Sequence, residues 1–222
     1  MHRPVWYSQF MRALQVIFAL TLLATPGIAT AQSGATLRVP VRSDSRLWLE
    51  GTSNVRDWKC SATSMEALID MDRRTMDSQD LKVIARSIHS VNVKVPVRML
   101  KCGDRHMEAN MYQALKAPKA PAVSYIVAKF DAIPQIAADG ISMEVTGRLS
   151  MAGVERSVQM TVATERMRDG TRRARGSVPI LMTDFGITPP RPWMGILRTA
   201  DKVLVQFEIF VSPQAVASAT PE

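Results

Sequence analysis

The sequence of 222 residues has few of the side chains that build most catalytic and metal centres. It holds only 3 histidines and 2 cysteines, which nearly excludes a site with several Cys and His ligands. Three common catalytic patterns, Gly-x-Ser-x-Gly, His-Glu-x-x-His and Gly-x-Gly-x-x-Gly, are missing from the sequence. The sequence therefore predicts a protein that is not an enzyme and that carries neither a metal ion nor a resident cofactor.

Aromatic residues are scarce, at 6%, whereas methionine occurs 14 times. Large aromatic rings fill a core efficiently, but the flexible methionine side chain suits an irregular or adaptable apolar surface. With 46% hydrophobic and 22% charged residues, the chain otherwise has the composition of a globular domain. These values exclude a disordered chain, a collagen and a small disulfide-dense scaffold.

The first 31 residues have the pattern of a secretory signal. Arg3 and Arg12 supply positive charge, Ala13–Ala24 is an apolar run, and Ala29–Ala31 has the small residues of a cleavage site. The run is too short to cross a bilayer about 30 Å thick as a helix, although an uncleaved N-terminal anchor is an alternative. We therefore expect a cleavable signal peptide at residues 1–31 and an exported protein.

Both cysteines, Cys60 and Cys102, follow this segment. An even pair of cysteines in an exported protein favours one disulfide bond between them, because the compartments outside the cytoplasm are oxidising. Two small buried thiols are the alternative.

Alternating apolar and polar residues recur between residues 36 and 212. Val91–Val97 is the clearest such run. Gly103–Lys116 changes to helical spacing, and Asp104 can cap the start of that helix. The pattern predicts one all-β domain over residues 36–212, either an antiparallel barrel of about eight strands or a sandwich, with one α-helix in a connection. Residues 213–222 are expected to form a flexible tail.

The apolar residues that share one side of the expected strands are called here the inner-face residues. They are Leu47, Leu49, Val91, Val93, Val95, Val123, Tyr125, Val127, Val145, Leu149, Met151, Val158, Met160, Val162, Val205, Phe207 and Ile209. A barrel of about eight strands can be filled by its own side chains or can hold one small ligand. The pattern alone therefore fits a solid core as well as a cavity, and the Tyr125 hydroxyl could meet a ligand or a partner within the core.

Several short segments, in order, resemble the YceI-like family over residues 45–211. They are Ser45–Val55 followed by Trp58, Met111–Ala117, Gly147–Val154, Asp184–Ile187 and Asp201–Val211. The resemblance implies a lipocalin-like antiparallel β-barrel in the bacterial periplasm that binds a polyisoprenoid, such as an isoprenoid quinone or its precursor, in an apolar lumen. The commoner form of the family opens with an aspartate and a His-Ser pair. Asp44-Ser45 lacks that histidine here, and Gly51–Asn54 is typical of a variant subgroup.

Two functions follow as hypotheses. The first is the carriage, storage or sequestration of an isoprenoid or other long-chain lipid, bound by the inner-face residues. The alternative is a non-catalytic interaction or structural module with a solid core, which would act through a surface such as the arginine-rich hairpin at residues 166–175.

The charge of the chain suggests a second kind of contact. The formal net charge is +8, and it becomes +6 without residues 1–31, which contain Arg3 and Arg12 and no acidic residue. This charge favours transient contact with an anionic membrane surface, and a basic surface that only keeps the protein in solution is the alternative. Nucleic acid is not an expected partner of an exported chain.

Overall fold

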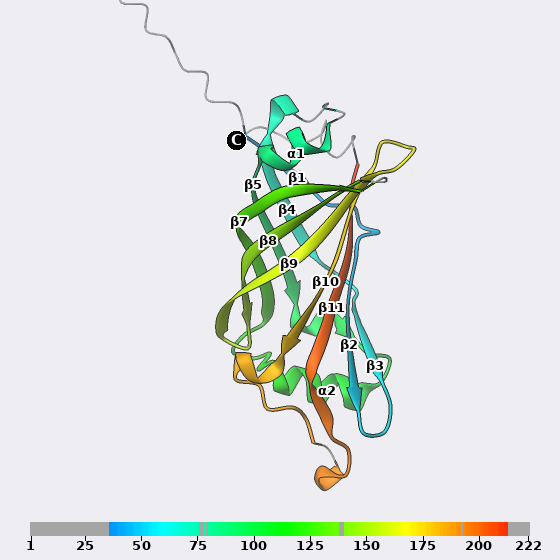
Figure 1. Ribbon diagram of the computed structural model, residues 1–222. Helices are drawn as coiled ribbons and strands as arrows, with labels where there is room; N and C mark the ends of the chain where they lie inside the picture. Colours follow the sequence, from blue (N-terminus) through cyan, green and yellow to red (C-terminus); the bar gives the residue numbers. More distant parts are fainter. Residues whose placement is uncertain (1–35, 76–77, 79, 138–139, 192, 213–222) are drawn as a thin grey trace, which may run out of the picture. The chain divides into compact units, whose positions relative to one another are not determined.

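Eleven antiparallel strands form one strongly curled sheet in the computed structural model of the chain (Figure 1). The structure describes residues 36–75, 78, 80–137, 140–191 and 193–212. The expected signal peptide at residues 1–31 and the expected tail at 213–222 lie outside these residues. The strands follow the order β1-β4-β5-β7-β8-β9-β10-β11-β2-β3-β6 across the sheet.

The elements have the following bounds. The strands are β1 (Thr36–Pro40), β2 (Arg46–Ser53), β3 (Trp58–Ala62), β4 (Glu66–Asp72), β5 (Ile88–Pro96), β6 (Leu100–Lys101), β7 (Ala122–Ala137), β8 (Gly140–Met151), β9 (Val154–Arg166), β10 (Arg172–Leu181) and β11 (Thr199–Val211). The α-helices are α1 (Leu81–Ser87) and α2 (Arg105–Ala114). Short 3₁₀ turns are η1 (Arg73–Thr75), η2 (Val97–Met99), η3 (Met182–Phe185) and η4 (Trp193–Gly195).

The prediction of a closed barrel of about eight strands was wrong in its strand number and its closure. One cause is the alternating stretch Asp57–Ile69, whose residues fold into two strands, β3 and β4, that join distant parts of the sheet. β3 pairs with β2 and β6, whereas β4 pairs with β1 and β5. The break follows Ala62, where Thr63 donates from its backbone N–H to the carbonyl oxygen of Met99 (2.8 Å). Alternation of side chains does not reveal such a break, because it continues on both sides of it.

The sheet has two edge strands, β1 and β6, but backbone hydrogen bonds next to each of them connect both edges to other parts of the sheet. Beyond β1, the backbone N–H of Arg42 donates to the carbonyl oxygen of Phe210 (2.9 Å). On the other side, β5 continues through η2 into β6, and the N–H of Val97 donates to the carbonyl oxygen of Pro121 (2.8 Å). The sheet is therefore a strongly curled half-barrel in which side chains of many strands face one interior.

The predicted helix is present as α2, and Asp104 caps it as expected by accepting a hydrogen bond from the N–H of Met107 (2.8 Å). A second helix, α1, was missed. It has only seven residues, and its capping residue Asp80 accepts from the N–H of Lys82. A helix this short has little periodicity, so its position depends on packing, here through Ile84 and Ala85.

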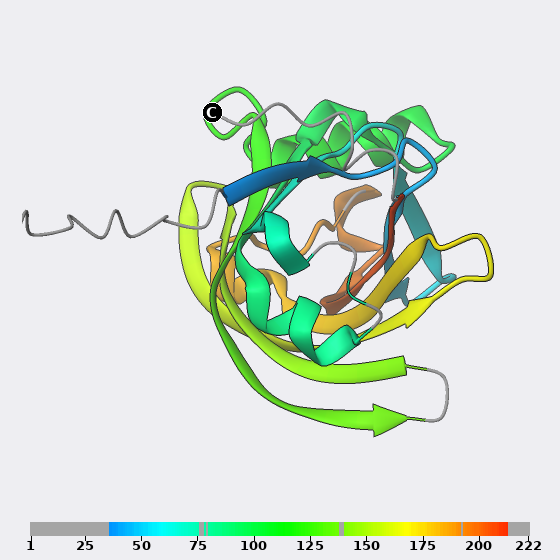
Figure 2. The ribbon, with the colours of Figure 1, turned by 90° about the horizontal axis from the view of Figure 1, so that it is seen from above.

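The two helices lie at opposite ends of the curled sheet (Figure 1). At one end, Ile84 of α1 packs with Val39 and Met71, with Ile88 and Val211 beside them. In the view along the strands, α1 lies across the space that the strands surround (Figure 2). At the other end lie α2, the β2–β3 turn and η4 (Figure 1). An apolar cluster therefore lies at the α1 end of the interior, and a helix and loops border the α2 end.

Candidate functional site

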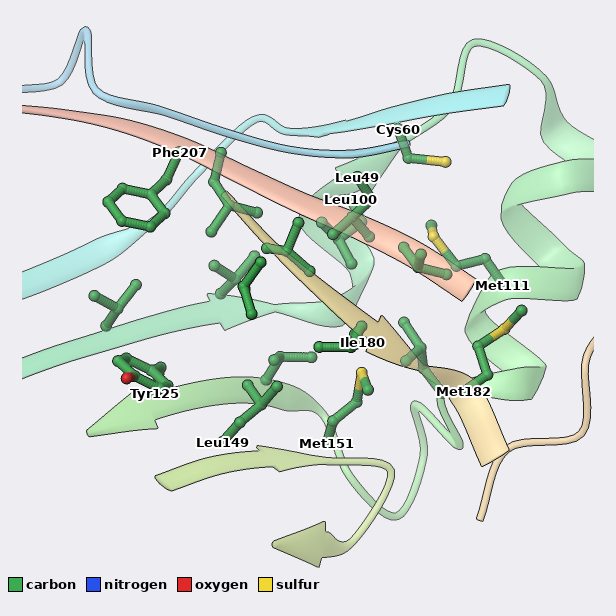
Figure 3. A pocket seen from close by; sticks show the side chains of 18 of the residues that line it. Leu49, Cys60, Leu100, Met111, Tyr125, Leu149, Met151, Ile180, Met182 and Phe207 are labelled. Atoms are coloured by element: carbon green, nitrogen blue, oxygen red, sulfur yellow. The ribbon is translucent and has the colours of Figure 1, made fainter. Parts of the chain in front are cut away.

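A cavity of about 820 Å³ lies inside the curled sheet (Figure 3). All of the inner-face residues line it, and they come from six strands. They are Leu47 and Leu49 of β2; Val91, Val93 and Val95 of β5; Val123, Tyr125 and Val127 of β7; Val145, Leu149 and Met151 of β8; Val158, Met160 and Val162 of β9; and Val205, Phe207 and Ile209 of β11. The alternation in the sequence thus identified side chains that the fold brings together from strands far apart along the chain.

The size of this space separates the two interpretations that periodicity left open. Close-packed protein interiors contain few voids larger than a water molecule. A volume of about 820 Å³ instead falls in the range of roughly 300–1,000 Å³ that small-molecule sites occupy. The side chains of the protein therefore leave an apolar space that is large enough for a ligand.

Other parts of the lining were not found from the sequence. Met107, Met111 and Ala114 of α2 face the cavity, together with Ala174, Val178 and Ile180 of β10. The signal for the helix was its spacing, which places these three residues on one face. In β10 the many arginines obscured the apolar positions between them. Figure 3 shows Met111 of α2, Met151 of β8 and Met182 of η3 at the same end of the cavity.

Three aromatic rings of the lining pack closely against glycines of a neighbouring strand. A Cβ atom on any of these glycines would overlap the ring above it. The pairs are Trp58 over Gly51, Tyr125 over Gly147 and Phe207 over Gly176. Because each glycine leaves room on the wall, the ring covers the backbone without standing up into the cavity. This arrangement explains how the lining can contain large aromatic residues and remain open.

The Tyr125 hydroxyl is satisfied by the wall of the cavity. It donates a hydrogen bond to the carbonyl oxygen of Val158 (3.2 Å), so it acts as a core tyrosine and its proton is not offered to a ligand. Burial disfavours the charged phenolate and raises the pKa of Tyr125 to about 12.

This pKa predicts a loss of stability in alkali. The folded state holds the Tyr125 proton more tightly than the unfolded state, whose pKa is near 10.0. The stabilisation is therefore complete below pH 10 and is lost as the pH rises towards 12. We expect ultraviolet absorbance to show one late tyrosine titration, which Tyr125→Phe removes and denaturant returns to the ordinary range. A Tyr125→Phe variant that keeps the late titration would contradict the assignment.

Polar side chains gather at the α2 end of the lining. They are Ser53, Arg56, Asp104, His106, Asn110 and Thr199. The backbone N–H of Met107 hydrogen-bonds to Asp104 and holds the pKa of that carboxyl below its usual value, with the nearby charge of Arg56 adding to the effect. The cavity thus has a charged, hydrogen-bonding end and an apolar body, which is the polarity of an amphipathic ligand.

A disulfide bond fixes this end of the cavity. Cys60 of β3 and Cys102, which precedes α2, are joined at an S–S distance of 2.01 Å, as expected from the sequence. Cys60 is 2% exposed and lines the cavity. Further along, Glu108 accepts from the N–H of Cys102 (3.1 Å), and the Tyr112 hydroxyl donates to the carbonyl oxygen of Leu100 (2.8 Å). These bonds hold α2 against the sheet.

The described residues contain neither a cluster of metal ligands nor a membrane-spanning helix. No three His, Cys, Asp or Glu side chains in this part of the chain form a group that could hold a metal ion. No described helix has the length and apolar character needed to cross a membrane.

A curled antiparallel sheet around an apolar cavity defines a class of β-proteins that enclose a ligand-sized interior. Within that class, the model of the YceI-like domain matches residues 43–211. The chain belongs to the YceI-like family.

Solved structures of three bacterial proteins show a similar fold. BcnA of Burkholderia cenocepacia is 18% identical, with a TM-score of 0.59 over 77% of this chain and 98% of that one. A polyisoprenoid binding domain of Saccharophagus degradans, implicated in plant cell wall breakdown, is 12% identical, with a TM-score of 0.56 over 79% and 98%. The YceI protein of Campylobacter jejuni is 16% identical, with a TM-score of 0.50 over 73% and 85%. Among curated proteins, no sequence matches this chain.

Proposed function

We propose that the protein is an exported, periplasmic binding protein for an isoprenoid-type lipid, such as an isoprenoid quinone or its precursor. The observation that carries the proposal is the open apolar cavity of about 820 Å³. A related fold, that of the Saccharophagus degradans domain, is described as polyisoprenoid binding, which supports the choice of lipid. In this role the protein carries, stores or sequesters the lipid without altering it chemically.

The proposed binding follows from burial of the tail. Each CH₂ group removed from water contributes about 0.8 kcal/mol, and part of this is offset by ordering of the tail and of the protein. The inner-face residues would contact the tail, and flexible methionines such as Met107 and Met111 can adapt to its branches. The polar end near Arg56 and Asp104 would receive the head group. A solid core, the premise of the alternative interaction module, does not fit this interior.

Export is supported by two features. Residues 1–31 have the pattern of a cleavable signal peptide. The Cys60–Cys102 disulfide is a bond that persists in oxidising compartments and is rare in the cytoplasm.

Native mass spectrometry of the freshly purified protein tests the proposal. We expect a bound mass in the range of isoprenoid lipids, which organic solvent releases and which is taken up again when the emptied protein is mixed with an isoprenoid quinone. A protein that carries no lipid after purification and takes up none afterwards would contradict the proposed function.

A further inference from the structure

The most exposed large apolar side chains of the described residues occur together. Met194 is 100% exposed, Ile196 67% and Val55 63%, whereas the other exposed large hydrophobic residues range from 37% to 42%. All three belong to two segments, the β2–β3 turn and the η4 loop. We call the surface formed by Val55, Met194 and Ile196 the apolar tip. Large apolar groups in water are costly, so an exposed cluster of them marks an interaction surface.

Hydrogen bonds hold the two segments of the tip together. Asn54 donates from its side-chain amide to the carbonyl oxygen of Ile196 (2.9 Å) and accepts from the backbone N–H of Arg198 (2.7 Å). The N–H of Asn54 also donates to the carbonyl oxygen of Arg198 (3.1 Å). These bonds tie the β2–β3 turn to the loop, and the tip is one surface contributed by both.

The backbone of η4 adopts a disfavoured conformation to present Met194. Its φ angle is 53°, in the left-handed region that residues with a Cβ atom seldom enter, and Gly195 follows with a φ of 85°. This conformation leaves the Met194 side chain entirely in solvent. Strain that exposes an apolar group has no benefit for folding, and such outliers are typical of functional loops.

The tip borders the polar end of the cavity. Ile196 points into solvent, while the next residue, Leu197, lines the cavity. Across from it, Val55 is exposed and the next residue, Arg56, lines the cavity. A surface that the tip touches is therefore adjacent to the polar end of the cavity.

The charge around the tip is positive. Residues 53–57 and 190–198 contain Arg56, Arg191 and Arg198 and one acidic residue, Asp57, and the carboxylate of Asp104 also lies near Arg56. All three arginines are exposed. Apolar side chains surrounded by arginines match the interface of a bilayer with anionic lipids, whose head groups attract cations and whose acyl region receives apolar groups.

We propose that the apolar tip docks the protein on the surface of an anionic bilayer, so that the cavity opens towards the membrane. The docking itself does not depend on the ligand, but its use in lipid transfer rests on the proposed function. The tip differs from the arginine-rich hairpin at residues 166–175, which joins β9 and β10 near the α1 end (Figure 1). There Arg173 pairs with Glu165 and Glu208, so part of that charge is already neutralised.

Sedimentation with lipid vesicles tests the docking on the processed protein recovered from the periplasm of an expressing bacterium. We expect binding to vesicles of phosphatidylcholine and phosphatidylglycerol, and a loss of roughly tenfold in partitioning for the double variant Met194→Ser/Ile196→Ser. The matched control is Leu68→Ser/Met167→Ser, which removes exposed apolar groups away from the tip and should leave partitioning within about twofold of the wild type. Arg191→Glu should weaken binding to the anionic vesicles and not to vesicles of phosphatidylcholine alone.

The results separate this proposal from the proposed function. The docking is overturned if the tip variant partitions as well as the wild type. It is also overturned if the wild type binds neither kind of vesicle, and a protein partner is then the remaining occupant of the tip. Uptake of a water-soluble apolar fluorescent probe is measured on the same samples. A wild type that docks and takes up no probe would defeat the lipid-binding function and leave the docking standing. Thermal unfolding shows that each variant is folded.

Discussion

Replacement of Val93 by tryptophan should lower the affinity for an apolar ligand by about ten- to a hundredfold, because overpacking an apolar site costs about 1–3 kcal/mol. Val93 lies on β5 between Ala67 of β4 and Tyr125 of β7, and its side chain lines the cavity. The indole ring would occupy space that the ligand needs. In the empty protein the same ring fills part of a void, so thermal stability should stay equal or increase.

The control for this experiment is the neighbouring residue on the same strand. Lys94 is exposed, and its side chain points to the other face of the sheet. Lys94→Trp introduces the same ring outside the cavity and should leave the affinity unchanged. Displacement of a fluorescent apolar probe measures both variants. Equal affinity in Val93→Trp and the wild type would show that ligands bind elsewhere.

Removal of the disulfide should lower the free energy of unfolding by about 4 kcal/mol. The bond joins residues separated by 42 positions, and in the chain-entropy model a loop of this length restricts the unfolded state strongly. For a chain of this size, the melting temperature should fall by about 10 °C. Denaturant unfolding of Cys60→Ala/Cys102→Ala, compared with the oxidised and the reduced wild type, measures the change.

The same variant tests whether the bond also holds the α2 end of the cavity. Relative to the oxidised wild type, we expect the rate of amide hydrogen exchange to increase more in α2 than in the central strands β8 and β9. The reason is that Cys102 anchors the segment that leads into the helix. Reduced wild type and the double alanine variant should behave alike. If both unfold at the denaturant concentration of the oxidised protein, the bond has no structural role.

Local patterns were sufficient for several features of this protein. The alternation in β8 is read directly from the residues, since Met143, Val145 and Leu149 are buried while Glu144 and Arg148 are exposed. The start of α2 was predictable from Asp104, whose carboxylate accepts a backbone hydrogen bond one turn into the helix. Such features depend on residues that are near neighbours in the chain.

Other features depend on contacts that no short window contains. Trp58 covers Gly51 only because β2 and β3 pair in a register that sets these two residues opposite each other. The apolar positions of β10 could be placed in the lining only after β9 and β11 were seen to flank that strand. Met194 is fully exposed in a loop where its φ angle is 53°, and composition carries no information about either property.

By itself, the sequence determined which side chains share a strand face, where α2 begins, which cysteines can pair and which family the chain resembles. Only the tertiary structure decided that the described residues form one sheet of eleven strands with β1 and β6 at its edges, that the interior stays open, and that the apolar tip lies beside the polar end of the cavity. The reason is physical. Periodicity and capping arise from interactions within a few residues, whereas the volume left inside a curled sheet depends on how strands distant in sequence curve, pair and pack against one another.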